Sequence, residues 1–230
     1  MKLLAFDTST ECCSAALLDG AELLLQEAMT ERGHAELILP MVDGLLAQGG
    51  VALGDLDGIA FGRGPGGFTG LRIAAGVAQG LAYGAGLPVA LVSSLAAVAE
   101  RVPAAAGEAI LVCNDARMGE VYWGLYVRQV DGSVAILGSE RVSPPDVVAA
   151  AASAGHAAGN GLARFASLRS ALAARGLQVH EGLYPRADAI ARLGVLEFAA
   201  GRTLPPEAAL PSYVRDEVAT VPPGPVTPLQ

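Results

Sequence analysis

Two turns in this sequence combine residues that could bind a phosphate group or a metal ion. Residues 61–72 read Phe-Gly-Arg-Gly-Pro-Gly-Gly-Phe-Thr-Gly-Leu-Arg, and the four glycines and the proline at 62–67 separate an apolar run from an Ala- and Gly-rich helical pattern. Such a turn directs backbone N–H groups toward one point, which suits a phosphate or the close approach of another backbone. A second turn, Asp-Thr-Ser-Thr at residues 7–10, follows the first apolar run. Because neither turn has the spacing of a P-loop or of Gly-x-Gly-x-x-Gly, phosphate binding and simple close packing both stay open.

The carboxylates at these turns are the candidates for metal chemistry. Asp7 ends the first apolar run, and Asp115 follows a later one at residues 109–113. Two carboxylates facing one cleft could hold Mg²⁺ in an ATPase. Each could equally accept backbone N–H bonds within its own turn, as aspartates at turns commonly do. The sequence leaves both roles open.

The histidines and serines lack the spacing of an active site. His34 begins a helical pattern, but Ile38 stands one turn later, where a second metal ligand would lie. A solitary histidine at a helix start predicts a polar contact or an interface residue rather than a metal site. His156 and His180 have no partner at ligand spacing, and no Gly-x-Ser-x-Gly elbow surrounds any serine.

Composition argues against several classes of protein. The net charge of −8 over 230 residues does not suit a freestanding nucleic-acid binder, because neutralising phosphates requires a basic face. Three cysteines without a Cys-x-x-Cys pair argue against disulfides and zinc, and favour the reducing cytoplasm. A charge near the start argues against a signal peptide. Residues 73–99 carry no charge, but Gly86 and Pro88 interrupt them, so we expect a buried helix and strand instead of a membrane span.

Apolar periodicity predicts two similar units. Residues 2–28 have the order strand, acidic turn, strand, Asp-Gly turn, strand, and residues 109–137 repeat it. The other expected elements are helices at 34–46, 68–83, 95–102, 144–154, 160–175 and 188–201, and strands at 59–61, 89–92 and 178–180. Half of the 14 prolines fall in the last 27 residues, which predicts an extended tail with a possible docked strand at 212–214.

This duplicated plan predicts an α/β protein of the two-lobed actin-like, ribonuclease-H-like architecture, with mixed sheets flanked by helices. The expected parts are a first lobe at 1–104, a second lobe at 105–204 and a proline-rich tail at 205–230. In this architecture the turn after each lobe's first strand faces an interlobe cleft that holds nucleotide phosphates. Asp7 and Asp115 are the matching positions. Ser9 stands where such enzymes usually have a glycine, which weakens the prediction of an ATPase.

Two helical patterns offer a surface for binding a partner. The first carries a stripe at helical spacing that includes His34, Leu37, Ile38, Met41 and Leu45. The second has a glycine at every fourth residue, at Gly76, Gly80 and Gly84. Each glycine weakens a helix by about 1 kcal/mol relative to alanine, so the close approach of another backbone should compensate. That backbone belongs either to the sheet beneath or to a partner helix.

Several motifs resemble the TsaB family, also called YeaZ. They are Leu-Ala-Phe-Asp-Thr-Ser-Thr at 4–10, His-x-x-x-Ile-Leu-Pro at 34–40, the glycine-rich run at 62–72, Asp-Ala-Arg-Met-Gly-Glu-Val-Tyr-Trp at 115–123, and Pro-x-Tyr-x-Arg at 211–215. They span most of the chain, and no common loop repeats the run at 62–72. The resemblance implies a non-catalytic partner of TsaD, the transferase that attaches a threonylcarbamoyl group to N6 of adenosine 37 in tRNAs reading codons that begin with A.

The resemblance also implies what this chain lacks and what it binds. TsaD has a His-x-x-x-His metal pair just after the strand that follows the shared glycine loop. Ser94 and Val98 occupy the corresponding positions here, so we expect no catalytic residue and no metal site. The implied partners are TsaD, the small ATPase TsaE and, when the chain is alone, a second copy. Contact with tRNA is expected only through the complex, whose other subunits bind ATP or ADP and a metal ion.

Two sets of residues are therefore expected to carry function. The expected partner surface comprises His34, Leu37, Ile38, Met41, Leu45, Gly76 and Gly80. A vestigial nucleotide cleft is expected at Asp7, Thr8, Ser9, Gly64, Gly66 and Asp115. The competing functions are an independent ATPase or sugar-type kinase that uses this cleft, and a peptidase. The serine in the first turn counts against the ATPase, and the missing metal pair and serine elbow count against the peptidase.

Overall fold

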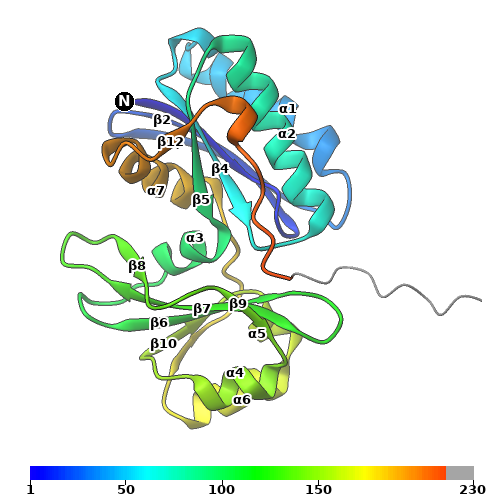
Figure 1. Ribbon diagram of the computed structural model, residues 1–230, viewed down its shortest axis with the longest axis vertical. Coiled ribbons are helices and arrows are strands. Elements are labelled where there is room, and N and C mark those ends of the chain that lie inside the picture. The colour runs from blue at the N-terminus through cyan, green and yellow to red at the C-terminus, as the bar shows by residue number, and fades with distance from the viewer. Residues whose placement is uncertain (216–230) are drawn as a thin grey trace, which may run out of the picture.

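The protein folds as two lobes, each built on a six-stranded sheet with helices on its faces (Figure 1). The computed structural model describes residues 1–215. Lobe 1 is built on the N-terminal strands, and lobe 2 on strands from the middle of the chain. The predicted α/β class with mixed, helix-flanked sheets is confirmed.

The sheet of lobe 1 brings the two candidate turns together. Its strands are β1 (Lys2–Asp7), β2 (Cys12–Asp19), β3 (Glu22–Met29), β4 (Gly58–Gly64), β5 (Val89–Ser93) and β12 (Thr203–Leu204), in the spatial order β12-β5-β4-β1-β2-β3. β2 is antiparallel to β1 and β3, whereas β4 is parallel to β1 and β5. Because parallel strands end at the same edge, the turns that follow β1 and β4 are neighbours.

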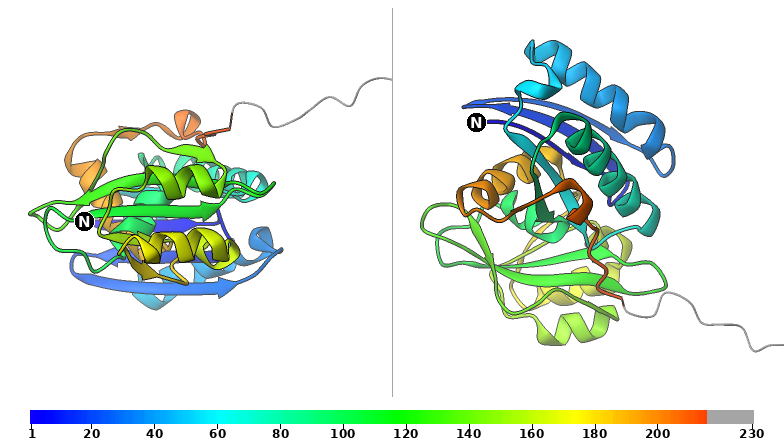
Figure 2. Two further views of the ribbon diagram at one scale, coloured as in Figure 1. Left: turned by 90° about the horizontal axis from the view of Figure 1, so that it is seen from below. Right: turned by 45° about the horizontal axis from the view of Figure 1, so that its top comes forward.

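Helices cover both faces of this sheet. On the outer face, α1 (His34–Gly49) and α2 (Phe68–Ala85) lie side by side, as the right-hand view of Figure 2 shows. Their apolar stripes pack on the side chains of Phe6 and Phe61, whose rings stack in the centre of the core. On the inner face, toward lobe 2, lie α3 (Ser94–Glu100) and α7 (Ala187–Ala199). A short 3₁₀ helix, η1 (Leu53–Asp55), precedes β4.

Lobe 2 repeats the strand order of lobe 1 with shorter elements. Its strands are β6 (Ala109–Asp115), β7 (Val121–Arg128), β8 (Val134–Ile136), β9 (Arg141–Ser143), β10 (His156–Ala158) and β11 (Gln178–His180), and its helices are α4 (Pro145–Ala151), α5 (Gly161–Arg164) and α6 (Ala166–Ala174). The helices pack on one face of the sheet, and α3 covers the other. β9 and β10, each of three residues, were not predicted. The predicted helix at 160–175 is broken in two at Phe165.

The predicted boundary of the second lobe at residue 204 is wrong. After β11 the chain returns to lobe 1, where α7 packs on β1, β4 and β5 and β12 extends the sheet beside β5. Ala189, Ile190 and Leu193 of α7 are buried against Leu3 and Ala60 of lobe 1. An apolar helical period shows that a helix is buried, but it does not show which of two sheets covers it.

The segment after β12 runs back over lobe 1 toward lobe 2. It contains the 3₁₀ helix η2 (Pro206–Ala208), which packs on α2. The backbone N–H of Ser212 donates to the carbonyl of Arg63 at 2.8 Å. Residues 212–214 dock through this bond but are not assigned as a strand. Of the predicted tail at 205–230, residues 216–230 lie outside the part that the structure describes.

Candidate functional site

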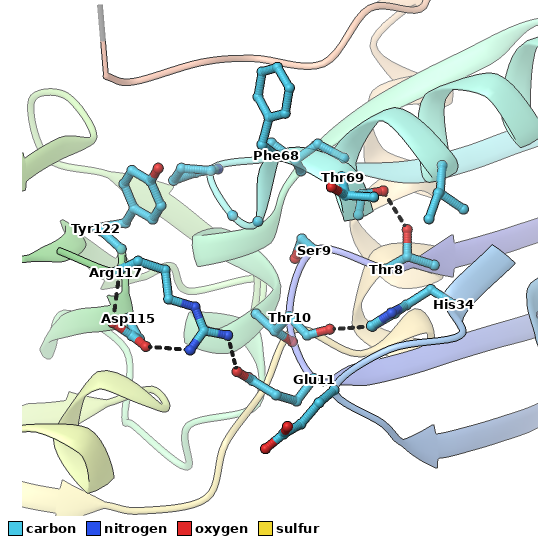
Figure 3. Close-up of a pocket in the computed structure, with 18 of the residues that line it drawn as sticks. Thr8, Ser9, Thr10, Glu11, His34, Phe68, Thr69, Asp115, Arg117 and Tyr122 are labelled. Atoms are coloured by element: carbon cyan, nitrogen blue, oxygen red, sulfur yellow. Dashed lines mark hydrogen bonds and ion pairs between the residues drawn. The ribbon is translucent and has the colours of Figure 1, made fainter. Parts of the chain in front are cut away.

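A cavity of about 640 Å³ lies between the lobes and is the candidate site (Figure 3). Five segments and Asn160 line it: the β1–β2 turn, residues 31–36 at the start of α1, the β4–α2 loop, the β6–β7 turn and the C-terminal segment at 212–215. Among the residues expected in a nucleotide cleft, Thr8, Ser9, Gly66 and Asp115 line this cavity, whereas Asp7 and Gly64 do not. We call it the interlobe cleft.

Asp7 is sealed beneath the first turn instead of facing the cleft. Its side chain is completely buried, and its Oδ1 accepts bonds from the backbone N–H and the hydroxyl of Ser9 at 2.8 and 2.7 Å. The hydroxyl of Ser94 donates to Oδ2 at 3.0 Å. A Cβ atom on Gly62 would lie 1.8 Å from the same oxygen, so the backbone closes over it. Burial raises the pKa of Asp7, although the bonds from Ser9 and Ser94 oppose this shift. Of the two roles left open for Asp7, binding Mg²⁺ and accepting hydrogen bonds within its own turn, the geometry favours the second.

Asp115 ends β6 as Asp7 ends β1, and each accepts the backbone N–H two residues on, but the lobe 2 side chain that faces inward as Asp7 does is that of Asn114. Side chains alternate along β6, so Asn114 faces α3 together with Ile110 and Val112, as Asp7 faces the inner side of its own sheet. Asn114 is 1% exposed, and neither polar atom of its amide has a hydrogen-bond partner among the described residues. Asp7 and Asp115 therefore do not point into one site: Asp115 lines the cleft, whereas Asp7 is buried beside it.

The glycine-rich loop is shaped by contact with the first turn. A Cβ on Gly66 would lie 2.6 Å from the carbonyl oxygen of Ser9, and one on Gly70 would lie 1.9 Å from that of Thr8. The hydroxyl of Thr8 donates to the carbonyl of Gly70 at 2.7 Å, and the N–H of Gly67 donates to that of Ser9 at 2.7 Å. These glycines therefore allow two backbones to touch. Of the two explanations left open for this loop, phosphate binding and close packing, the structure favours close packing.

Side chains of the two lobes meet across the cleft. Oε1 of Glu11 lies 2.7 Å from Nη2 of Arg117, and Oε2 accepts from Nδ2 of Asn160 at 3.1 Å. Figure 3 shows Arg117 extending between Asp115 and Glu11. The sequence did not predict that these three side chains meet, because a contact between positions so far apart leaves no local pattern.

The aromatic side chains of Phe68 and Tyr213 line one end of the cleft. The rings of Phe68 and Tyr213 lie 5.6 Å apart, and the guanidinium of Arg72 lies 3.7 Å above the Phe68 ring. Nε of Arg72 also donates to the hydroxyl of Tyr213 at 3.2 Å. These contacts fasten the C-terminal segment to the start of α2.

Most of the expected partner surface on α1 is not available to a partner. Ile38, Met41 and Leu45 are at most 8% exposed and form part of the core of lobe 1, and Leu37 packs against that core. His34 is half-buried, and its Nε2 bonds the carbonyl oxygen of Thr10 at 2.7 Å, which ties α1 to the first turn. The predicted α1 interface is therefore wrong at these core positions: the stripe faces the sheet.

Three glycines of α2 lie on the side of the helix that faces away from the sheet. Gly76, Gly80 and Gly84 are exposed, and a Cβ placed on any of them would meet no atom within 4 Å. Exposed Tyr83 on α2 and Leu39 on α1 lie on the same helix pair, at 80% and 45% exposure. We call Gly76, Gly80, Tyr83 and Gly84 the open face of α2.

Ser94 and Val98, the two positions expected to replace a metal pair, are buried. Ser94 and Val98 are both 0% exposed, with Ser94 bonded to Asp7 and Val98 packed between α3 and the lobe 2 sheet. Within residues 1–215 there is no group of three or more His, Cys, Asp or Glu side chains that could hold a metal ion. The helices of that same region include none that is long and apolar enough to cross a bilayer.

Comparison with known proteins gives consistent matches. The family model of TsaD, described as tRNA N6-adenosine threonylcarbamoyltransferase, matches residues 27–176. The tRNA threonylcarbamoyladenosine biosynthesis protein TsaB of Escherichia coli K12 is 38% identical over 226 residues, which cover 95% of this chain and 96% of that protein. The crystal structure of YeaZ from Pseudomonas aeruginosa matches with a TM-score of 0.80 and 41% identity, over 92% of this chain and 99% of that one.

A more distant match concerns the fold alone. Component A of (R)-2-hydroxyglutaryl-CoA dehydratase from Acidaminococcus fermentans has a TM-score of 0.51 at 9% identity, over 86% of this chain and 99% of that one. Together with YeaZ, this likeness confirms the predicted two-lobed actin-like architecture.

Proposed function

The chain belongs to the TsaB family, and from this premise we propose that it acts in tRNA threonylcarbamoyladenosine biosynthesis as the non-catalytic partner of TsaD. In this role it binds and activates the transferase that attaches the threonylcarbamoyl group to N6 of adenosine 37, in tRNAs reading codons that begin with A. TsaE joins the assembly in the cytoplasm. Without TsaD, a second copy of the chain occupies the same surface.

The observation that carries this proposal is the open face of α2. Glycine in the middle of an exposed helix costs stability, and no atom of lobe 1 approaches Gly76, Gly80 or Gly84 closely enough to explain it. A partner helix could lie directly against this backbone, with Tyr83 and Leu39 as adjoining apolar contacts. The sheet beneath α2, which was the other alternative, contacts the opposite side of the helix.

The lack of catalysis is supported by the residues at the candidate site. Ser94 and Val98 offer no pair of metal ligands, and both are enclosed in the core. ATP with its metal does not fit the interlobe cleft well either, because Asp7 is sealed and Glu11 places a carboxylate between the two turns. We assign the nucleotide and the metal of the complex to TsaD and TsaE.

The charge of the chain supports an indirect role toward tRNA. With a net charge of −8, an isolated molecule would repel the phosphate backbone over most of its surface. We assign the main tRNA contacts to the partner subunits.

The proposal is tested by placing a large side chain on the open face of α2. Gly80→Arg and Gly76→Arg have room in the isolated chain, and arginine favours a helix over glycine, so both variants should fold at least as well as the wild type. We expect binding to TsaD, measured by calorimetry and by light-scattering mass, to weaken by at least about tenfold, as for a central interface position.

Gly155→Arg is the matched control. Gly155 is an exposed glycine of lobe 2 that also has room for a side chain, so this variant adds the same charge far from α2. It should bind TsaD like the wild type. A folded Gly76→Arg, Gly80→Arg double variant that binds TsaD with wild-type affinity would refute the proposed surface. Transferase activity of the chain alone, without TsaD, would refute the non-catalytic role.

A further inference from the structure

The carboxylate of Glu11 is bonded entirely to the opposite lobe. Glu11 lies in the β1–β2 turn of lobe 1, and its side chain is about 25% exposed. One oxygen is paired with Arg117 at 2.7 Å and the other accepts from Asn160 at 3.1 Å, both in lobe 2. Lobe 2 thus provides the donors, and lobe 1 provides the anion.

Lobe 2 holds these donors in place without help from Glu11. Asp115 Oδ1 accepts the backbone N–H of Arg117 at 2.9 Å, and Oδ2 lies 3.2 Å from its guanidinium. The backbone N–H of Asp115 donates to Oδ1 of Asn160 at 2.9 Å, which turns the Nδ2 of that amide toward the cleft. One residue therefore orients both donors.

The backbone of the β6–β7 turn is also held in an unfavourable conformation. Arg117 and Met118 have φ angles of 62° and 53°, in the left-handed region that residues other than glycine rarely adopt. Such a conformation persists only where the surroundings hold it, and it is common at ligand-binding turns. Here it carries the Arg117 side chain into the cleft, where that side chain stays 70% exposed.

We propose that Glu11 is an internal anion that occupies an oxyanion-binding site of lobe 2 and thereby excludes external anions from the interlobe cleft. A guanidinium and an amide N–H bind carboxylates and phosphates through the same hydrogen bonds. The cleft of about 640 Å³ adjoins this site and has room for a small organic phosphate. Because Glu11 belongs to the same chain, its effective concentration is high and a free anion competes poorly.

The test measures the binding of inorganic phosphate to the full chain by calorimetry at low ionic strength. The wild type should bind phosphate weakly, and Glu11→Ala should bind it at least tenfold more tightly, because two donors are released and one negative charge is removed. Glu31→Ala is the matched control: Glu31 is an exposed glutamate that also lines the cleft, and its loss should leave phosphate affinity at the wild-type value. A second titration with ADP distinguishes a free phosphate from a nucleotide phosphate as the preferred ligand.

Two results would overturn the proposal. The first is a Glu11→Ala variant with the phosphate affinity of the wild type. The second is a gain in affinity that persists in the Glu11→Ala, Arg117→Ala double variant, since the anion would then bind elsewhere. If Glu11→Ala does not fold by circular dichroism, Glu11→Gln carries the same test, because it keeps the size of the side chain and removes only its charge. None of these measurements needs TsaD, so their outcome is independent of the proposed function.

Discussion

The glycine-rich loop and the open face of α2 both depend on glycine, but for opposite reasons. At Gly62, Gly66 and Gly70, a Cβ atom would lie between 1.8 and 2.6 Å from atoms of the first turn. At Gly76 and Gly80, which lie about two and three turns beyond Gly70 in α2, a Cβ would meet nothing within 4 Å.

This difference separates glycines that the fold requires from glycines that the fold does not require. In the loop, the fold itself excludes side chains, because Gly66 and Gly70 touch the backbone of the first turn and Gly62 touches the carboxylate of Asp7. On α2 the isolated chain gains nothing from glycine and loses helix stability. A sequence pattern that the fold does not need is best explained by something outside the chain. We therefore assign the open face of α2 to a partner. The glycines of the loop are explained by the fold itself and need no bound phosphate.

The largest effect is expected for Gly70→Ala. The added methyl group would overlap the carbonyl of Thr8, and backbone on both sides resists movement, so the free energy of unfolding should fall by about 3 kcal/mol or more. Urea denaturation followed by circular dichroism measures this.

Gly67→Ala is the control for this prediction. It lies in the same loop, but its Cβ would be 3.4 Å from the nearest atom and its φ is −63°, so no overlap results. Loss of glycine at this N-cap should cost about 1 kcal/mol at most. Equal losses in the two variants would show that the loop does not depend on close backbone contact.

A smaller effect, which depends on pH, is expected from Asp7→Asn. The folded-state pKa of Asp7 is raised by burial above the unfolded value of 3.8, so the folded state holds this proton more tightly than the unfolded state does. The contribution of Asp7 to stability is therefore complete below the unfolded pKa and is lost as pH rises through the folded one. Each unit of pKa difference corresponds to about 1.4 kcal/mol.

Stability curves of both proteins between pH 4.5 and 7.5 test this. The other carboxylates cancel in the difference between the two, which should shift in favour of asparagine as the pH rises. Asn114, which faces inward near the end of β6, shows that the fold of lobe 2 accepts a buried amide in such a place. A difference that is independent of pH would mean that Asp7 keeps an ordinary pKa, and that the first turn does not seal it as described.

Local signals made most of the fold predictable, and long-range contacts made the rest unpredictable. The Asp19-Gly20 turn and the repeated strand order gave the hairpins of both lobes, since the period of a strand and its turn residues are neighbours in sequence. The return of α7 to lobe 1 could not be read in this way, because its buried stripe would suit either sheet. Thr203–Leu204, with two residues, is too short to show a period at all.

The candidate site was predictable only in part, for the same reason. The glycine spacing on α2 correctly identified an unusual helix, but the stripe on α1 was assigned to a partner although Leu45 is fully buried against the sheet. An amphipathic pattern gives the side of a helix that is covered and not the identity of its cover. Glu11 and Arg117 meet only because both lobes fold, so their pairing has no trace in the local sequence.

The smallest effect, and the one whose sign decides the comparison, is expected for Gly76→Ala and Gly80→Ala. Alanine at an exposed helix position should raise the free energy of unfolding of the isolated chain by about 0.5–1 kcal/mol per site, since no neighbouring atom is displaced. The measurement is made over a range of protein concentrations, so that any self-association is separated from the intrinsic stability.

Binding to TsaD should weaken in the same variants, because even a methyl group moves a closely packed helix away. Stability and partner affinity should therefore change in opposite directions. If either substitution instead lowers the stability of the monomer, the fold itself requires that glycine, and the distinction between the loop and the open face of α2 fails at that position.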